Sequence, residues 1–329
     1  MSSPDFDDIA AAARRIAGHA VVTPLLESPE LSERVGGRLL IKAEVLQVTG
    51  SFKFRGAYAR LSALAADERS RGVVAWSSGN HAQAVAAAAR RLGIDAVIVM
   101  PADAPAVKID NTRAHGAEIV LYDRWRESRE AIGQAIAAER GAVIVPPYDD
   151  PGIVAGQGTL GLELAAQAEA LGARLDDVLA PCSGGGLVAG VALALERLSP
   201  ATIVHSVEPR GFDDTARSLA AGHRQANQPG AQSFCDALLA PMPGVVTFPI
   251  HQRLLGPGLV VDDHETAAAM AWAFARLKLV VEPGGAVALA AALSGRLDCR
   301  GRTVAVVLSG GNVDPATSLA AITGRPPPG

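Results

Sequence analysis

The chain has 329 residues, of which 49% are hydrophobic and 19% charged, and its formal net charge is −4. This is enough chain to bury a large core in one or two domains. No basic block suggests nucleic-acid binding, and no apolar run approaches the roughly 20 residues that a membrane span needs. Three widely spaced cysteines and an acidic, polar N-terminus lead us to expect a cytoplasmic protein.

Short β-branched runs alternate with alanine-rich stretches along the chain. Strands are expected at 73–76, 96–100, 119–122 and 143–145, with helices at 81–92, 106–115 and 126–140. A second series has helices at 157–172, 187–198, 266–277 and 285–293, and strands at 177–180, 202–207 and 303–308. This alternation with short connectors is typical of an α/β protein with parallel sheets.

Two interruptions divide this pattern into domains. They lie at Arg71-Gly72 and at the proline-rich segment 146–151. We therefore predict a small α/β domain at 72–149, inserted into a large domain formed by 1–71 and 150–329. The segment 222–249 is rich in Gly, Pro, Gln and Asn and is predicted to be a loop.

Lysine is rare in this chain, since the 30 basic residues include lysine at positions 42, 53, 108 and 278 alone. Lys53 lies between Phe52 and Phe54, with glycines on either side at 50 and 56. Apolar neighbours disfavour the ammonium form and lower the pKa of a lysine, which Schiff-base chemistry requires. The alternative is a lysine at a helix start whose stem is buried for structural reasons.

A polar turn follows the strand expected at 73–76. It contains Ser77, Ser78, Gly79, Asn80 and His81. Consecutive backbone N–H groups at a helix N-terminus form an anion site, into which a substrate carboxylate would fit. Asn80 offers a hydrogen bond to a neutral oxygen. The alternative is simple capping of the helix by serine.

A glycine-rich turn follows the strand expected at 177–180, and a second glycine-rich turn, at 308–312, follows the last expected strand. The first consists of Ser183, Gly184, Gly185, Gly186 and Leu187, whose backbone donors could surround a phosphate. Gly184, Gly186 and Ala189 also fit the dinucleotide pattern G-x-G-x-x-A, with Glu208 as the ribose-binding acid. One lysine and two such turns at strand ends favour a single phosphorylated aldehyde over a dinucleotide.

Four motifs in this order and spacing resemble the serine/threonine dehydratase and serine racemase group of fold-type II pyridoxal-phosphate enzymes. They are SFKFRGA (51–57), SSGNHAQAVA (77–86), CSGGGLVAG (182–190) and LSGGN (308–312), and the resemblance extends from about Thr23 to Asn312. It implies a tryptophan synthase β-like fold with pyridoxal 5′-phosphate bound covalently at Lys53, which would then act as the base on the substrate Cα. Phe52 would border the cofactor ring, Asn80 would hold its phenolic oxygen, residues 183–187 would bind the phosphate, Ser309 would meet the pyridine nitrogen and Glu282 would lie near the ring.

The resemblance also implies the reaction. A serine partner leaves the pyridine nitrogen largely unprotonated, so early loss of a β-leaving group is favoured over a long-lived carbanion. We therefore expect an ammonia-lyase that dehydrates L-threonine or L-serine to a 2-keto acid and ammonia. Serine racemase is an alternative because Ser78 would lie opposite Lys53, although segment 240–243 departs from the racemases. The alternative from a different class is the NAD-dependent dehydrogenase of the dinucleotide pattern.

Arg129 matches an arginine that, in the racemase branch, can reach a second substrate carboxylate. It would make hydroxyaspartate a substrate. Phenylserine is a further alternative substrate, independent of Arg129. The alternative for Arg129 is a surface ion pair with a neighbouring glutamate.

A cation site is the last feature that the resemblance implies. Glu208, the Phe212 carbonyl and Asp214 would bind Mg²⁺ or Ca²⁺ through an oxygen shell. The alternative is an acidic loop that caps the following helix through Asp213 or Asp214. A homodimer with a small amino-acid substrate, and without nucleic-acid or membrane partners, is expected.

Overall fold

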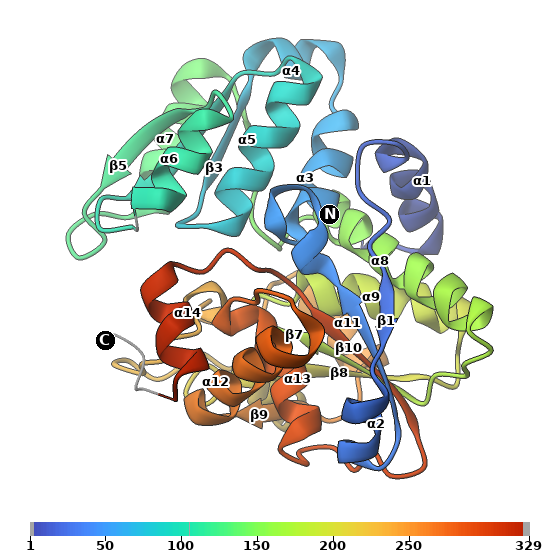
Figure 1. The fold of residues 1–329 in the computed structure, drawn as a ribbon. Coiled ribbons are helices and arrows are strands. Elements are labelled where there is room, and N and C mark those ends of the chain that lie inside the picture. Colours follow the sequence, from blue (N-terminus) through green and yellow to red (C-terminus); the bar gives the residue numbers. More distant parts are fainter. Residues whose placement is uncertain (1–2, 105, 325–329) are drawn as a thin grey trace.

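The computed structural model describes residues 3–104 and 106–324, which form two lobes, each built on one β-sheet (Figure 1). The strands of the larger lobe are β1 (Leu25–Glu27), β2 (Arg38–Ala43), β7 (Asp177–Pro181), β8 (Ile203–Pro209), β9 (Leu259–Val261) and β10 (Thr303–Leu308). Their order is β1-β2-β10-β7-β8-β9. All neighbours are parallel except β1 and β2, which are antiparallel.

Both faces of the six-stranded sheet are covered by helices, so its central strands are apolar on both sides. Ile41 and Val306 face a core formed with α12 (Asp263–Trp272) and α13 (Pro283–Leu293). Leu40 and Ala305, one residue away along the same strands, face a core formed with α8 (Pro151–Ala170) and α9 (Gly186–Leu198). This alternation follows from the two-residue period of a strand.

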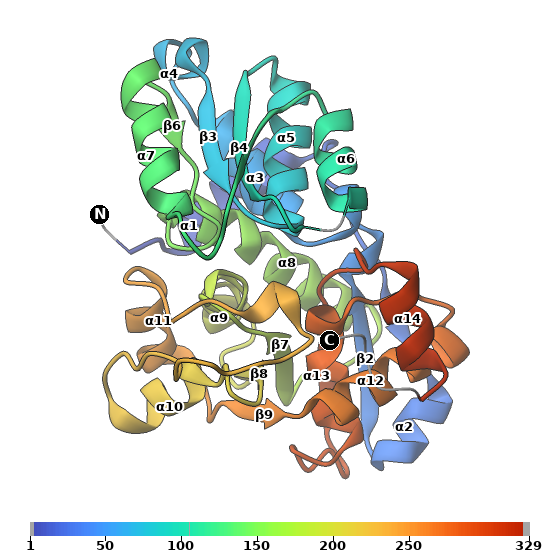
Figure 2. The same ribbon diagram turned by 90° about the vertical axis from the view of Figure 1, so that its left-hand side faces the viewer.

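The smaller lobe contains a parallel four-stranded sheet in the order β5-β4-β3-β6. Its strands are β3 (Val73–Trp76), β4 (Ala96–Pro101), β5 (Glu118–Tyr122) and β6 (Val143–Ile144). Figure 2 shows α5 (Asn80–Leu92) and α6 (Ala106–Ala114) on one face and α7 (Arg129–Arg140) on the other. The sheet lies within the predicted range 72–149, and the domain limits themselves stay a prediction.

Helix α3 (Lys53–Ser62) connects the lobes because it packs against both α5 and α8. Small residues allow the close approach to α8, since a Cβ on Gly156 would lie 2.6 Å from the Cα of Gly56. The other helices are α1 (Phe6–Ile16), α2 (Pro29–Val35), α4 (Ala66–Arg71), α10 (Asp214–Ala221), α11 (Thr247–Leu254) and α14 (Pro315–Ile322). Lys53, the first residue of α3, therefore lies where the two lobes meet.

The α/β fold with two parallel-dominated sheets is confirmed, and the predicted strands are all present. Helix α8 begins at Pro151 rather than at 157, because the Asp150 carboxylate accepts the Ile153 N–H at 2.9 Å and caps it. The predicted loop 222–249 is wrong at its end, where α11 begins at Thr247. No helix among the described residues is both long and apolar enough to cross a membrane.

Candidate active site

A cavity of about 280 Å³ lies at the carboxyl ends of β3, β7 and β10, where ligands bind in open parallel sheets. The structure brings together at this cavity every residue that the sequence suggested for cofactor or substrate binding. They are Phe52, Lys53, Ser77, Ser78, Gly79, Asn80, His81, Arg129, Ser183, Gly184, Gly185, Gly186, Leu187, Glu282 and Ser309. Their individual roles stay predictions.

Lys53 projects into this cavity from the start of α3. The N–H of Phe52 donates to the Ser309 carbonyl at 3.0 Å, which fixes the lysine beside the loop after β10. The Lys53 ammonium donates to the Pro147 carbonyl at 2.7 Å and lies 5.0 Å from the centre of the Phe52 ring. Burial lowers the pKa of Lys53 to about 8, although the Glu282 charge opposes this. A neutral, nucleophilic amine is therefore accessible near neutral pH.

Asn80 is held from two sides. Its amide nitrogen donates to Glu282 at 2.5 Å, and its oxygen accepts the Asn312 amide at 2.7 Å. Asn312 also donates to the Thr49 carbonyl at 2.8 Å. Burial and the Asp236 charge raise the pKa of Glu282 to about 7, so this buried carboxyl titrates near neutrality. The sequence indicated Asn312 as part of a motif and missed its positioning contact.

His81 and Arg129 line the cavity, but each already has a protein partner. A ring nitrogen of His81 lies 2.9 Å from the Val145 carbonyl, and burial lowers the pKa of this histidine to about 3. Arg129 donates to Glu130 at 2.8 Å, which is the ion pair that the sequence left as an alternative. This pair uses only Nε of Arg129, so binding a second substrate carboxylate does not require Arg129 to leave Glu130.

The glycine-rich turn before α9 is shaped by close contacts. Gly185 has a φ of +94°, which favours glycine. A Cβ on Gly184 would lie 2.2 Å from the Tyr148 ring, so the turn presses against this tyrosine. The Ser183 hydroxyl accepts the Ala240 N–H at 3.1 Å and so ties the 240–243 segment to the turn. The first N–H groups of α9 have no acceptor within the helix and suit an anion.

Three charged residues of the cavity, Lys108, Arg124 and Asp236, were not recognised in the sequence. Lys108, which is buried, donates to Asp236 at 2.5 Å and so joins α6 of the smaller lobe to the larger lobe. Its Nζ would lie 3.6 Å from a Cβ on Gly79 and therefore sits against the turn 77–81. The scarcity of lysine was the available signal for Lys108. Asp236 and Tyr148 carried no signal because the fold alone brings them to the cavity.

The predicted cation site contains two buried carboxylates. Glu208 accepts the N–H groups of Thr215 and Ala216 at 2.9 and 2.8 Å and thereby caps α10. The alternative, a cap by Asp213 or Asp214, is wrong, because the side chain of the N-cap residue Asp213 makes no capping bond and Asp214 accepts the Asn227 amide instead.

Negative charge is concentrated and buried at the predicted cation site, which was itself inferred from the family resemblance. Burial and the Asp214 charge raise the pKa of Glu208 well above its usual range, and burial raises that of Asp214 to about 6. Asp214 Oδ2 is buried without a hydrogen-bond partner among the described residues. Carboxylate and carbonyl oxygens are the ligands that a hard cation takes, but both Glu208 oxygens already accept N–H groups of α10, and no group of three His, Cys, Asp or Glu side chains within 3–104 and 106–324 is arranged to hold a metal. The cation site stays a prediction. The position of Glu208 also argues against the dinucleotide alternative, because its oxygens are committed to α10.

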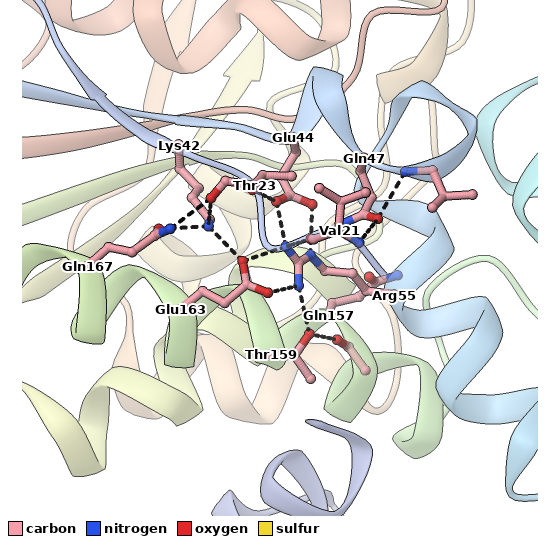
Figure 3. Close-up of polar contacts among 12 residues, drawn as sticks. Val21, Thr23, Lys42, Glu44, Gln47, Arg55, Gln157, Thr159, Glu163 and Gln167 are labelled. Carbon is pink, nitrogen blue, oxygen red and sulfur yellow. Dashed lines mark hydrogen bonds and ion pairs between the residues drawn. The ribbon is translucent and has the colours of Figure 1, made fainter. Parts of the chain in front are cut away.

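A network of buried charges surrounds Arg55, two residues after Lys53 on α3 (Figure 3). Arg55, fully buried, donates to Glu44 at 2.8 Å through two nitrogens and to Glu163 at 2.6 and 2.8 Å. Lys42, also fully buried, donates to Glu163, to the Thr23 carbonyl and to Gln167 at 2.7 to 2.8 Å. The network ties the start of α3 to β2 and α8.

Comparisons with known proteins agree with this geometry. The family described as pyridoxal-phosphate dependent enzyme matches residues 16–310. An L-threo-3-hydroxyaspartate ammonia-lyase of Saccharomyces cerevisiae is 40% identical over 326 residues, covering 99% of this chain and 98% of that protein. The structure is similar to that of maize serine racemase, with a TM-score of 0.92, 39% identity and 98% of both chains covered. It is also similar to a T.th. threonine deaminase, with a TM-score of 0.88, 46% identity, and 94% of this chain and 99% of that one covered.

Proposed function

Because this chain belongs to the family of pyridoxal-phosphate dependent enzymes, we propose that it is an ammonia-lyase that dehydrates a small β-hydroxy amino acid to a 2-keto acid and ammonia. The observation that carries the proposal is the shared cavity of Lys53, the turn 77–81 and the turn 183–187. A pyridoxal-phosphate enzyme that acts on an amino acid needs an amine for the cofactor aldehyde, a site for the cofactor phosphate and a site for the substrate carboxylate.

The residues present fit the cofactor. The turn 183–187 at the start of α9 suits its phosphate, and the amine of Lys53 suits its aldehyde. Ser309, which is buried and lines the same cavity, suits its pyridine nitrogen. The bound cofactor supplies an electron-withdrawing ring that stabilises negative charge at the substrate Cα.

The chain's own groups orient the substrate and move protons. The N–H groups of the turn 77–81 bind the substrate carboxylate at the start of α5. The Lys53 amine, with its pKa near 8, accepts the Cα proton and can return it to the leaving hydroxyl. Asn80, fixed by Glu282 and Asn312, holds the cofactor ring in one orientation.

Two more specific functions, the dehydration of hydroxyaspartate and the racemisation of an amino acid, each have separate support. Hydroxyaspartate is favoured by Arg129 and Lys108 in the cavity wall, because a cation would bind the second carboxylate. Racemisation is favoured by Ser78, which lines the same cavity as Lys53 and could move a proton on the other face. Relatives of both activities are about 40% identical to this chain, so sequence identity does not choose between them.

The test is release of 2-keto acid and ammonia from L-threonine, L-serine, L-threo-3-hydroxyaspartate and phenylserine. Lys53→Ala is the blank, and Lys278→Ala, at an exposed lysine, is the matched control. We expect equimolar products from at least one substrate, lost in Lys53→Ala and retained in Lys278→Ala. Cofactor-loaded protein that releases neither product from any of these substrates would refute the proposal, and chiral analysis of the recovered amino acid would then test racemisation.

Arg129→Gln separates the substrates further. For hydroxyaspartate we expect a KM about 10-fold or more higher than in the wild type, because one charge-assisted carboxylate contact is lost. For L-threonine no change is expected, and Arg126→Gln on the exposed loop before α7 is the control.

We also propose a cytoplasmic homodimer. The three cysteines are free and buried, which suits a reducing compartment, and two-fold assemblies are the commonest for soluble enzymes. Light scattering on the eluting protein would measure the mass in solution, and a monomer mass of 33.7 kDa would refute the dimer.

A further inference from the structure

Helix α11 lies behind the turn 183–187, on the side away from the cavity. Thr247 and His251, four residues apart and so on one face of this helix, are both fully buried. The Thr247 hydroxyl donates to the Gly184 carbonyl at 2.7 Å. His251 Nε2 lies 3.1 Å from the Gly185 carbonyl.

The contact is close enough to dictate the turn's composition. A Cβ on Gly185 would lie 2.0 Å from His251 Cε1 and 3.1 Å from Thr247 Oγ1. Burial lowers the pKa of His251 to about 4, so the ring is neutral and donates its Nε2 hydrogen to the carbonyl. The turn thus receives one hydrogen bond from each of two side chains of α11.

These two bonds help to set where the backbone donors of the turn point, together with the backbone bonds that the same two carbonyls accept, from the Gly244 N–H at Gly184 and from the Ala189 N–H of α9 at Gly185. In a trans peptide the C=O and the following N–H point in opposite directions. Because the Gly184 and Gly185 carbonyls point toward α11, the N–H groups of Gly185 and Gly186 point the other way. Both glycines line the cavity, so their N–H groups are aimed at the place where a phosphate would bind.

Helix α11 is itself anchored. The Asp149 carboxylate accepts the N–H groups of Val245 and Val246 at 2.9 and 2.7 Å, just before the helix begins. The Gly244 N–H donates to the Gly184 carbonyl as well, at 3.1 Å. The segment that supports the turn is therefore fixed to the connector between the lobes.

We propose that Thr247 and His251 are positioning residues that preset the turn 183–187 for a phosphate monoester by holding its carbonyls away from the cavity. This inference rests on the proposed function, since it takes the cofactor phosphate as the anion bound. Neither residue touches the ligand; each acts through a backbone carbonyl.

The experiment compares the affinities for pyridoxal 5′-phosphate and for pyridoxal, which lacks the phosphate, by absorbance titration of cofactor-free protein. The variants are His251→Leu and Thr247→Val, with His251→Gln as the conservative variant that retains a donor. Gln252→Ala, at an exposed residue of the same helix, is the matched control. Folding should survive in His251→Leu, since His251 Nδ1 is buried without a partner among the described residues and leucine removes it.

We expect His251→Leu and Thr247→Val each to weaken pyridoxal 5′-phosphate binding about 3- to 10-fold, the value of one hydrogen bond, and to leave pyridoxal binding unchanged. The ³¹P resonance of the bound phosphate should move in both variants, and His251→Gln should restore the wild-type values. Equal weakening of both ligands, or no change with either, would overturn the inference and leave the proposed function standing. Wild-type protein that binds no pyridoxal 5′-phosphate would overturn both.

Discussion

Replacing Arg55 by methionine should be among the most destabilising single changes in this protein. The guanidinium is fully buried and satisfies the carboxylates of both Glu44 and Glu163 (Figure 3). Methionine fills much of the same volume but leaves Glu44, also fully buried, without its main counter-charge. Lys42 cannot replace it, because its ammonium is already committed to Glu163 and two neutral acceptors.

The size of the stability loss in Arg55→Met follows from the burial of the ion pair. Removing one partner of a buried ion pair costs about 3–5 kcal/mol, since an uncompensated charge remains. A chain of 329 residues unfolds with an entropy of about 0.7 kcal/mol per kelvin, so Tm should fall by about 4–7 °C. Arg55→Met combined with Glu44→Gln should lose less than the sum of the single changes, because the stranded charge is removed.

The pH dependence of stability distinguishes two causes of the loss in Arg55→Met, the unpaired Glu44 charge and the lost packing. In the wild type burial raises the pKa of Glu44, but the charges of Arg55 and Lys42 and the hydrogen bonds from Arg55 and Thr23 together outweigh it, so the pKa is lowered. The stability from this group is therefore present above its unfolded pKa and is lost as pH falls through the folded value. In Arg55→Met the pKa of Glu44 should instead be raised, so the variant's penalty eases as pH falls from about 7 to about 5. The stability gap between the two proteins should therefore narrow over this range.

Thermal and urea unfolding at about pH 5, 6 and 7 measure this gap. Arg300→Met, which removes one partner of the exposed pair Arg300–Asp298, is the control and should leave Tm unchanged. A loss in Arg55→Met that does not vary with pH, or an additive double variant, would show that the cost comes from packing and refute the reasoning from charge.

Three further predictions follow from the site and the core. Mg²⁺ or Ca²⁺ should raise Tm of the wild type and have no effect on Asp214→Asn, and a wild type that EDTA and added metal leave unchanged would count against the cation site. Gly190→Ala should cost more than about 2 kcal/mol in urea unfolding, because its Cβ would lie 2.5 Å from backbone atoms of α8; a smaller loss would mean that the helices can separate. In cofactor-free protein, Glu282→Gln should raise Tm at about pH 8 and not at about pH 5. The folded pKa of Glu282 is raised to about 7, so the wild-type protein loses stability as pH rises from about 4.5 through 7, and glutamine avoids this loss. A shift of equal size at both pH values would contradict this assignment.

The parts of the site that could be predicted are those that local sequence encodes. A lysine between two phenylalanines and glycine turns after strands are short patterns with a direct physical meaning, and the structure places all of them around one cavity. Seven strands were equally accessible, because β-branched runs alternate there with alanine-rich helices, whereas β1, β2 and β9 lie outside that alternation and were missed.

The remaining parts depend on contacts between distant segments. His251 lies in a segment of ordinary helical sequence, and it becomes meaningful because α11 packs behind a turn 66 residues earlier in the chain. Glu208 resembled a ribose-binding or metal-binding acid, yet its oxygens cap α10, which no sequence pattern announced. The start of α8 was missed because Asp150 and Pro151 resembled a connector when they are a helix cap and its first residue.

The position of Lys53 at the junction of the lobes has a consequence for the topology of the loaded protein. A ligand that is joined covalently to Lys53 and bound non-covalently at Ser183 closes a loop of roughly 130 residues, which contains the whole four-stranded sheet. In its effect on the unfolded chain such a ligand resembles a disulfide, for which a loop of this length corresponds to at most about 5 kcal/mol of lost chain entropy. The cofactor would then be a cross-link as well as a catalyst, and the connector at 146–151 should be cut by proteases far more readily in the apoprotein than in the loaded enzyme.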